Sequence, residues 1–178
     1  QTFILTTSTT DTFTGTSGND SFVGVFSASA TKNTYDSGDS ISDGLTTDSD
    51  SFTLTTDNDN AAGTLIRNVE TINLNLDSVT TAAASPTIFN FAATNISGAK
   101  TYNADVVAPI SAVSGLTMTG IADSVTVNAT SDFRAIDLTA TAGKNLVVNA
   151  AAIGTSGTPV TVTTSTGTGS VTVTGAGH

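Results

Sequence analysis

Cysteine and tryptophan are absent from this chain of 178 residues, and histidine and tyrosine are scarce. Without cysteine the chain has no disulfides, no thiolate zinc sites and no cysteine nucleophile. The only histidine is the terminal His178, so a Ser-His-Asp triad would depend on the last residue of the sequence. Two tyrosines, Tyr35 and Tyr102, are too few to build the aromatic platforms that line most polysaccharide-cleaving clefts. We therefore predict that the chain is not an enzyme.

Charge is also scarce, because charged residues make up only 11% of the chain and its polarity comes mainly from Thr, Ser, Asn and Gly. With 38% hydrophobic residues, this composition is typical of a low-charge β protein. The formal net charge of −10 argues against nucleic acid and anionic membranes as partners. No apolar run approaches the ~18 residues of a membrane span, so we expect no membrane insertion. The start at Gln1 and the ending GAGH predict an excised fragment whose targeting signals would lie outside it.

The acidic residues are concentrated in the first third of the chain. Residues 1–60 carry nine acids against one lysine, whereas residues 61–178 carry six acids against four bases. Many of these acids stand beside Gly, Asn and Ser, which favour tight turns, and carboxylate, amide and carbonyl oxygens are the ligands of Ca²⁺. We therefore predict Ca²⁺ sites with these ligands: Asp11, Gly18, Asn19, Asp20, Asp36, Asp39, Asp43, Asp48, Asp50, Asp57 and Asp59. The alternative is an acidic, solvated loop region without bound ions.

Two segments set Gly and acidic residues just before an aromatic residue in an alternating run: Thr10–Gly24 (TDTFTGTSGNDSFVG) and Tyr35–Thr55 (YDSGDSISDGLTTDSDSFTLT). The first segment is similar to the nonapeptide calcium repeat G-G-x-G-x-D-x-U-x, in which U is a large apolar residue. Four of its residues match the repeat: Gly15, Gly18, Asp20 and Phe22. Thr16 stands where the repeat has its second Gly. In the second segment Asp50 and Phe52 match the D-x-U end, but the expected glycines are missing.

Residues 1–76 also resemble a known family. The resemblance lies in pieces that occur in the same order there: TFILT (Thr2–Thr6), DTFTGTSGNDSFVG (Asp11–Gly24), GDSIS (Gly38–Ser42), an Asp/Gly turn, and NVETINL (Asn68–Leu74). The family is the Caulobacter-type bacterial surface-layer (S-layer) protein, together with related RTX-like, type I-secreted proteins. The resemblance implies a calcium-dependent β-solenoid from a secreted lattice or adhesin protein. It also implies a location at the bacterial cell surface or outside the cell.

The pattern of short apolar runs predicts strands along most of the chain. We expect strands within Thr2–Thr7, Thr12–Val25 and Ser40–Thr56, with Phe3 and Leu5 on one face and Ile4 on the other. Thr56–Gly63 is expected to be a turn, and 65–76 a turn followed by a strand. A strand at Ile88–Phe91 and then a polar loop with Asn95 and Gly98 are expected to follow. The later strands are expected at these short runs: Val106–Val107, Ile110–Val113, Leu116–Met118, Val125–Val127, Ile136–Leu138, Leu146–Val148, Val160–Val162 and Val171–Val173.

These runs recur every ~10 to 14 residues, which suits either solenoid rungs or an antiparallel β-sandwich. We favour an all-β, irregular parallel β-solenoid (β-helix) with calcium-binding turns in the N-terminal third. The apolar residues are mostly Val, Ile, Leu and Ala, which suit the narrow core of a solenoid. Thr, Ser and Asn side chains can also form ladders between neighbouring rungs. The antiparallel β-sandwich is the alternative. Residues 1–76 would form the calcium-binding β region, and 77–178 would continue the same elongated domain as a Thr/Ala/Val-rich solenoid.

Two further charged residues have competing interpretations. Glu70 lies between apolar neighbours, and we expect it to cap a turn or to pair with Arg67. The alternative is a calcium ligand that joins Glu70 to the acid cluster. Arg134 is expected to form a surface ion pair with Asp132 or Asp137, which would contribute little stability.

The sequence thus predicts a structural, calcium-dependent module of a secreted bacterial surface-layer or extracellular matrix protein that self-associates with other copies when Ca²⁺ binds. The alternative is a ligand-binding module of a large type I-secreted adhesin that recognises a cell-surface polysaccharide or another surface. A polysaccharide-active β-helix enzyme is the third and least favoured function.

Overall fold

The computed structural model describes residues 1–56, 60–76, 87–106, 113–130, 133, 135–150, 161–164 and 169–175. These residues form seventeen strands and no helix, so none of the described segments is a helix that could span a membrane. The expected all-β class is confirmed. Three sheets contain all the strands, and we name them A, B and C.

Sheet A has eight strands: β1 (Thr2–Ile4), β3 (Ser21–Phe26), β5 (Ser51–Thr56), β8 (Thr71–Leu76), β11 (Thr101–Val106), β13 (Val125–Ala129), β15 (Leu146–Ala150) and β17 (Val171–Gly175). Sheet B has four strands: β2 (Thr12–Thr14), β4 (Ser40–Ser42), β7 (Leu65–Arg67) and β10 (Ile96–Ser97). Sheet C has five strands: β6 (Asn60–Ala62), β9 (Thr87–Ala92), β12 (Val113–Ile121), β14 (Ala135–Ala140) and β16 (Thr161–Thr164).

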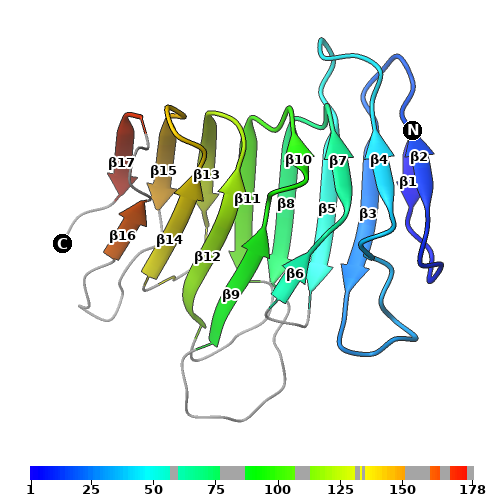
Figure 1. Ribbon diagram of the computed structural model, residues 1–178, viewed down its shortest axis with the longest axis horizontal. Helices are drawn as coiled ribbons and strands as arrows, with labels where there is room; N and C mark the ends of the chain where they lie inside the picture. The colour runs from blue at the N-terminus through cyan, green and yellow to red at the C-terminus, as the bar shows by residue number, and fades with distance from the viewer. Residues whose placement is uncertain are drawn as a thin grey trace.

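Every pairing between the described strands is parallel. After each strand of sheet A the chain passes through sheet B, sheet C or both, and then returns to sheet A beside the strand it left. The strands therefore stack along the long axis, with β1 and β2 at one end and β17 at the other (Figure 1). The alternative of an antiparallel sandwich is wrong. The parallel sheets are compatible with a solenoid-like fold.

Alternation along most strands of sheet A places every second side chain in the core, whereas the residues of the last strand, β17, are all exposed. In β5 and β8 the buried positions begin at Phe52 and Ile72, which are direct neighbours across the two strands. Phe22 precedes them in the same row, and Tyr102 follows them. At the first strand, the expected faces are confirmed, because Leu5 is buried while Ile4 is 66% exposed.

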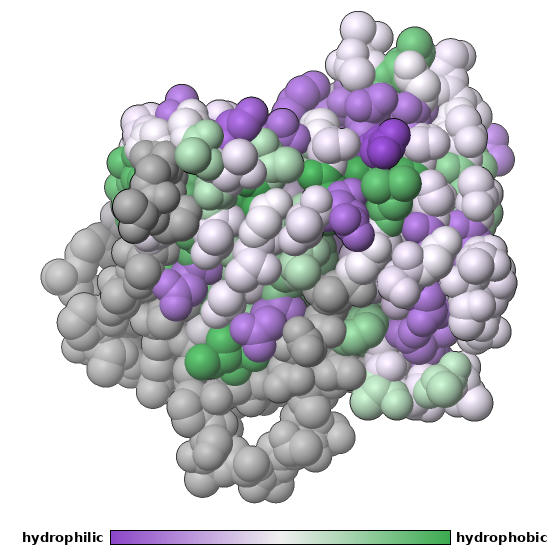
Figure 2. Space-filling model, viewed as in Figure 1, coloured by the Kyte–Doolittle hydropathy of each residue, from purple (hydrophilic) through white to green (hydrophobic). Residues whose placement is uncertain are grey.

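An asparagine ladder runs along the outer side of sheet A. Asn103 donates from Nδ2 to Oδ1 of Asn73 at 2.8 Å and accepts a bond of the same length from Asn128. Asn149 donates in turn to Asn128 at 2.9 Å. The expectation that like polar residues pair between neighbouring strands is confirmed for these four residues. On the face shown in Figure 2 the described surface is mostly polar or near neutral, and its apolar patches are separate from one another.

The expected strand boundaries need three corrections. Each of the long runs Thr12–Val25 and Ser40–Thr56 is divided into a strand of sheet B and a strand of sheet A, because the acidic segment between them forms a turn. The predicted turn at Thr56–Gly63 contains strand β6, and the predicted loop around Asn95 and Gly98 contains β10. The segment 65–76 begins with strand β7 rather than with a turn. Strands β6 and β10 pair with β9 and β7, and this pairing overrides the local turn preference of Asn and Gly.

Several expected features lie outside the described residues: Asp57, Asp59, Val107, Ile110, Val160, Asp132 and Arg134. The boundary between the regions 1–76 and 77–178 stays a prediction. Sheet A passes across it, since β8 pairs with β11 over six residues.

Candidate metal centre

The acids that lie closest together occupy the turns that lead from sheet B to sheet A. Asp20, Asp50 and Glu70 each stand directly before a strand of sheet A, namely β3, β5 and β8. Alternation turns their side chains inward, on the same side as the core residues two positions later. All three acids are buried. The D-x-U pattern of the sequence therefore indicates correctly that these acidic side chains point inward.

Hydrogen bonds from main-chain N–H groups to side-chain carboxylates join these three acids into a ladder. The N–H of Asp20 donates to Oδ1 of Asp50 at 2.8 Å, and the N–H of Asp50 donates to Oε2 of Glu70 at 3.0 Å. Each carboxylate thus satisfies the N–H at the equivalent position of the preceding strand. These bonds have a structural role, because they satisfy main-chain N–H groups in the turns. They occupy one carboxylate oxygen of Asp50 and one of Glu70.

Asp43 faces the ladder from the end of strand β4. One of its oxygens, Oδ2, accepts the N–H of Leu45 at 2.5 Å. The neighbouring turn leaves room for its carboxylate because residue 15 is a glycine: a Cβ at that position would overlap Oδ1 of Asp43 and would lie 2.8 Å from Oδ2 of Asp20. Gly15 does not have a positive φ, so its role is to provide space rather than an unusual backbone conformation.

The described acids form two groups in which one carboxylate oxygen per residue lies within 4.8 Å of the others. The first group is Asp20, Asp43 and Asp50, and the second is Asp48, Asp50 and Glu70. Asp50 belongs to both. These buried acidic groups could hold a metal ion, because their oxygens are close enough to share a cation.

Four of the carboxylate oxygens are buried and have no hydrogen-bond partner among the residues that the structure describes: Oδ1 of Asp43, both oxygens of Asp48 and Oδ2 of Asp50. The residues Asp43 and Asp50 are only 4% and 1% exposed. A buried carboxylate oxygen without a donor is costly, and a native structure usually satisfies it with a proton, a water or a cation. The unpartnered oxygens therefore mark the side of the cluster that a cation would occupy.

The electrostatic environment differs along the ladder. Burial raises the pKa of Asp50, and the charges of neighbouring acids raise it further, although the N–H of Asp20 opposes the shift. The pKa of Asp20 is lowered instead, chiefly by the hydrogen bond with the terminal ammonium of Gln1, which lies 2.8 Å from Oδ1. The N–H of Thr16 also stabilises the Asp20 carboxylate. The charge of Asp50 is thus less compensated than that of Asp20.

Glu70 has a cationic neighbour in Lys100, the residue directly before strand β11. The Lys100 ammonium lies 3.5 Å from Oε1 of Glu70 and is largely exposed. Glu70 therefore combines the two interpretations that the sequence left open: it satisfies a turn N–H, and it belongs to a group of acids that could hold an ion. Its cationic partner is Lys100 rather than the expected Arg67.

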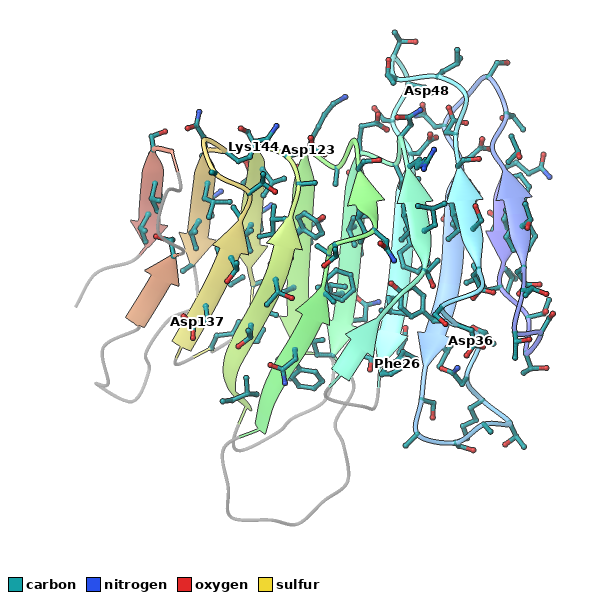
Figure 3. All side chains as sticks on the ribbon, in the orientation of Figure 1. Phe26, Asp36, Asp48, Asp123, Asp137 and Lys144 are labelled. Atoms are coloured by element: carbon teal, nitrogen blue, oxygen red, sulfur yellow. The ribbon has the colours of Figure 1, made fainter. Side chains whose placement is uncertain are left out.

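A second set of predicted ligands lies at the opposite edge of the sheets, where Figure 3 places Asp36 far from Asp48. Asp39 there repeats the ladder bond, since its Oδ1 accepts the N–H of Asp11 at 2.8 Å. Its Oδ2 accepts the N–H of Asp36 at 2.7 Å, so both oxygens have donors. Asp11 accepts from the N–H and hydroxyl of Thr6. These three acids hold turns together and are not among the groups of described acids that could bind a metal.

The two remaining predicted ligands in the described turns lie at the rim of the cluster. Asn19 is exposed, and its Oδ1 accepts the N–H of Ser49 at 3.0 Å, which ties two successive turns together. Gly18 is also exposed, and its carbonyl accepts the hydroxyl of Thr16 at 3.3 Å. Neither contributes an unpartnered buried oxygen.

Two residues of the candidate centre, Glu70 and Gly15, are not predicted from the sequence to be part of it. The sequence pattern favours a structural role for Glu70, although E-x-I at 70–72 stands in the same place before a strand as the two D-x-F pairs. It matches Gly15 to the calcium repeat but does not name this glycine as part of the site. Comparison of the chain with protein-family models, with curated proteins and with solved structures gave no match.

Proposed function

We propose that the chain is a calcium-dependent structural module of a secreted bacterial surface-layer or extracellular matrix protein, and that its three parallel sheets are the faces of one irregular β-solenoid. The single observation that carries this proposal is the set of buried carboxylate oxygens without donors in the turns before β5. The order of the acidic motifs, which resembles that of S-layer proteins, supports the cellular role.

The free energy of the cation-free turn explains why an ion is needed. Asp43 and Asp50 are almost fully buried and share a group with a third acid. Like charges at ~4 Å repel by about 1 kcal/mol even in water, and by more when they are partly desolvated. A divalent cation would replace this repulsion with attraction and would satisfy the unpartnered oxygens. It would therefore link successive strands of sheet A through their turns.

The donor set favours Ca²⁺ over other divalent ions. Both groups contain only carboxylates, and the chain has no cysteine and only one histidine, at position 178. Zn²⁺ prefers nitrogen and sulfur ligands, whereas Ca²⁺ takes six to eight oxygens in flexible geometry. Mg²⁺ demands octahedral geometry and holds its waters tightly. We therefore expect Ca²⁺ to bind more tightly than Mg²⁺.

A calcium titration followed by thermal unfolding tests this proposal. A ligand that binds only the folded state raises its stability by about 1.4 kcal/mol when its free concentration is about ten times Kd. The melting temperature should therefore rise steadily with calcium and much less with magnesium. The matched control is Asp137→Asn, because Asp137 is exposed on β14 and lies far from Asp48 (Figure 3). A melting temperature independent of calcium would refute the proposal.

Self-association is the second part of the proposed role. In sheet A β1 and β17 each pair with a single described strand, and the edge of a parallel sheet can accept a further strand. Calcium would lower the net negative charge that keeps copies apart. Sedimentation at increasing calcium concentration should show assembly that monovalent salt of equal ionic strength does not produce. If the chain stays monomeric while it binds calcium, a ligand-binding module of a secreted adhesin replaces the lattice role.

A further inference from the structure

The five acids do not form one group in which all the carboxylates lie close enough together to share an ion. Ca²⁺ lies about 2.3–2.6 Å from each oxygen ligand, so two ligands of the same ion can be separated by about 5 Å at most. The oxygens within each group of three satisfy this limit, but the described acids fall into two such groups rather than one. Asp43 belongs only to the first group, and Asp48 belongs only to the second.

Each group has its own unpartnered oxygens. Asp43, with its unpartnered Oδ1, belongs to the first group alone, and Asp48, with two unpartnered oxygens, belongs to the second group alone. Asp50 belongs to both groups; its Oδ1 accepts the N–H of Asp20, and its Oδ2 has no partner among the described residues. A single ion in either group would leave buried oxygens of the other group without a partner.

The charge of the cluster allows this stoichiometry. Five carboxylates make up the two groups: Asp20, Asp43, Asp48, Asp50 and Glu70. Two ammonium groups lie beside the ends of the ladder: that of Lys100, 3.5 Å from Glu70, and that of Gln1, 2.8 Å from Asp20. With these two positive charges counted, one divalent ion would leave a net charge of −1 and two would leave +1. Both counts bring the cluster close to neutrality, so the unpartnered oxygens decide the number of ions.

We propose that the centre holds two divalent cations bridged by the carboxylate of Asp50. This inference rests on the proposed calcium-binding function and adds its stoichiometry. The inner ion lies among Asp20, Asp43 and Asp50, and the outer ion lies among Asp48, Asp50 and Glu70. The outer ion binds more weakly, because Asp48 is only half-buried, whereas the three acids of the inner group are all buried. The two ions thus fill in order as the calcium concentration rises.

Three substitutions of Asp by Asn separate the two sites. Asp43→Asn removes charge from the inner site alone, and Asp48→Asn removes charge from the outer site alone. Asp50→Asn weakens both, yet its remaining oxygen can still accept the N–H of Asp20, so the ladder bond is retained. The loss of one ligand charge is expected to weaken an affected site by about tenfold or more.

Isothermal titration calorimetry and native mass spectrometry with Ca²⁺ measure the number of bound ions. We expect two ions for the unaltered chain and for Asp137→Asn. At calcium concentrations that fill both sites of the unaltered chain, Asp43→Asn and Asp48→Asn should each retain one ion, and Asp50→Asn should retain neither fully. A second titration with Lys100→Met should show tighter binding of the weaker ion and no change in the tighter one.

The possible failures are distinguishable. One ion per chain, weakened alike by Asp43→Asn and Asp48→Asn, would overturn the two-ion centre and leave the proposed calcium-dependent function in place. No bound ion would overturn both. If Asp43→Asn does not fold, the stoichiometry of the unaltered chain and the effect of the more exposed Asp48→Asn still decide the question: two ions reduced to one support the centre, and any other result overturns it.

Discussion

Gly15 lies so close to the carboxylate of Asp43 that no side chain fits between them, because a Cβ on Gly15 would overlap Oδ1 of Asp43. The contact joins the ends of strands β2 and β4, whose next residues these are. Three residues further along the first turn, Gly18 has nothing within 4 Å of its Cβ position. Neither glycine has a positive φ, so an alanine at either position differs mainly in the space it needs.

Gly15→Ala should therefore destabilise the protein and weaken calcium binding, whereas Gly18→Ala should do neither. The added methyl group must displace the Asp43 carboxylate, and overpacking of this kind costs about 1–3 kcal/mol. Chemical unfolding at a fixed calcium concentration, together with calcium titration, measures both effects. Equal stabilities and equal calcium affinities for the two variants would show that the turn has room for a methyl group beside the Asp43 carboxylate.

Asp39→Asn and Asp50→Asn should separate a structural acid from a metal ligand. Both oxygens of Asp39 accept main-chain N–H groups, so the side-chain NH₂ that the substitution introduces would meet an N–H donor, at a cost of about 1–3 kcal/mol. The calcium affinity should remain unchanged. In Asp50→Asn one oxygen can keep its N–H partner, and the main loss should be in calcium affinity. Calcium titration and unfolding in chelator distinguish the two outcomes. A loss of calcium affinity in Asp39→Asn would mean that the acids at the opposite edge also bind ions.

The asparagine ladder should stabilise sheet A without any dependence on calcium. Asn103→Ala removes two ladder bonds, one to Asn73 and one from Asn128. Of the ladder bonds between described residues, Asn149→Ala removes one, the bond to Asn128, and it is the matched control. Since a hydrogen bond contributes about 1 kcal/mol, Asn103→Ala should be the more destabilising variant by about that amount. The difference should be the same in calcium and in chelator when unfolding is followed by circular dichroism.

Alkaline pH should destabilise the fold through its two buried tyrosines. Burial raises the pKa of Tyr35 from its ordinary value of 10.0 to about 12, and burial also raises the pKa of Tyr102. Below pH 10 both side chains are neutral in the folded and the unfolded chain, so they cause no dependence on pH. Between pH 10 and about 12 the unfolded chain loses these protons first, and the stability of the folded state falls as the pH rises.

Tyrosinate absorbance in the near ultraviolet provides the measurement. The folded chain should titrate above the ordinary tyrosine range, and the absorbance should rise together with unfolding as followed by circular dichroism. Ionisation of both tyrosines near pH 10 in a chain that remains folded would contradict their burial.

The residues that could be predicted from the sequence are those with a strong local pattern. The D-x-F pairs at Asp20 and Asp50 indicate where an acid points inward before a strand, and the structure places both in one group of acids. The sequence separation between equivalent positions of successive strands in sheet A is irregular, however. It is 30 residues from Asp20 to Asp50 and 20 residues from Asp50 to Glu70. No fixed period could therefore reveal that Glu70 stands in the same row, or that a third sheet begins with β6.

The sequence also does not reveal which acids have hydrogen-bond donors for both carboxylate oxygens and which have a donor for only one. Asp39 and Asp50 both stand directly before a strand, and each accepts the N–H of the residue directly before the neighbouring strand, Asp11 or Asp20. They differ only in the second oxygen, which meets the N–H of Asp36 in one case and no donor in the other. This difference arises from the conformation of the intervening turn, which the residue types alone do not determine.

Hydrogen exchange at neutral pH, with calcium and with chelator, tests the central claim most directly. If divalent ions hold the turns before β3 and β5 together, calcium should slow the exchange of the N–H groups of Asp20 and Asp50. Chelation should speed it, while the N–H of Thr126, paired within sheet A on β13, should change little. In Asp50→Asn the protection of Asp20 should no longer depend on calcium. Identical exchange of these N–H groups in calcium and in chelator would contradict a structural role for the ion.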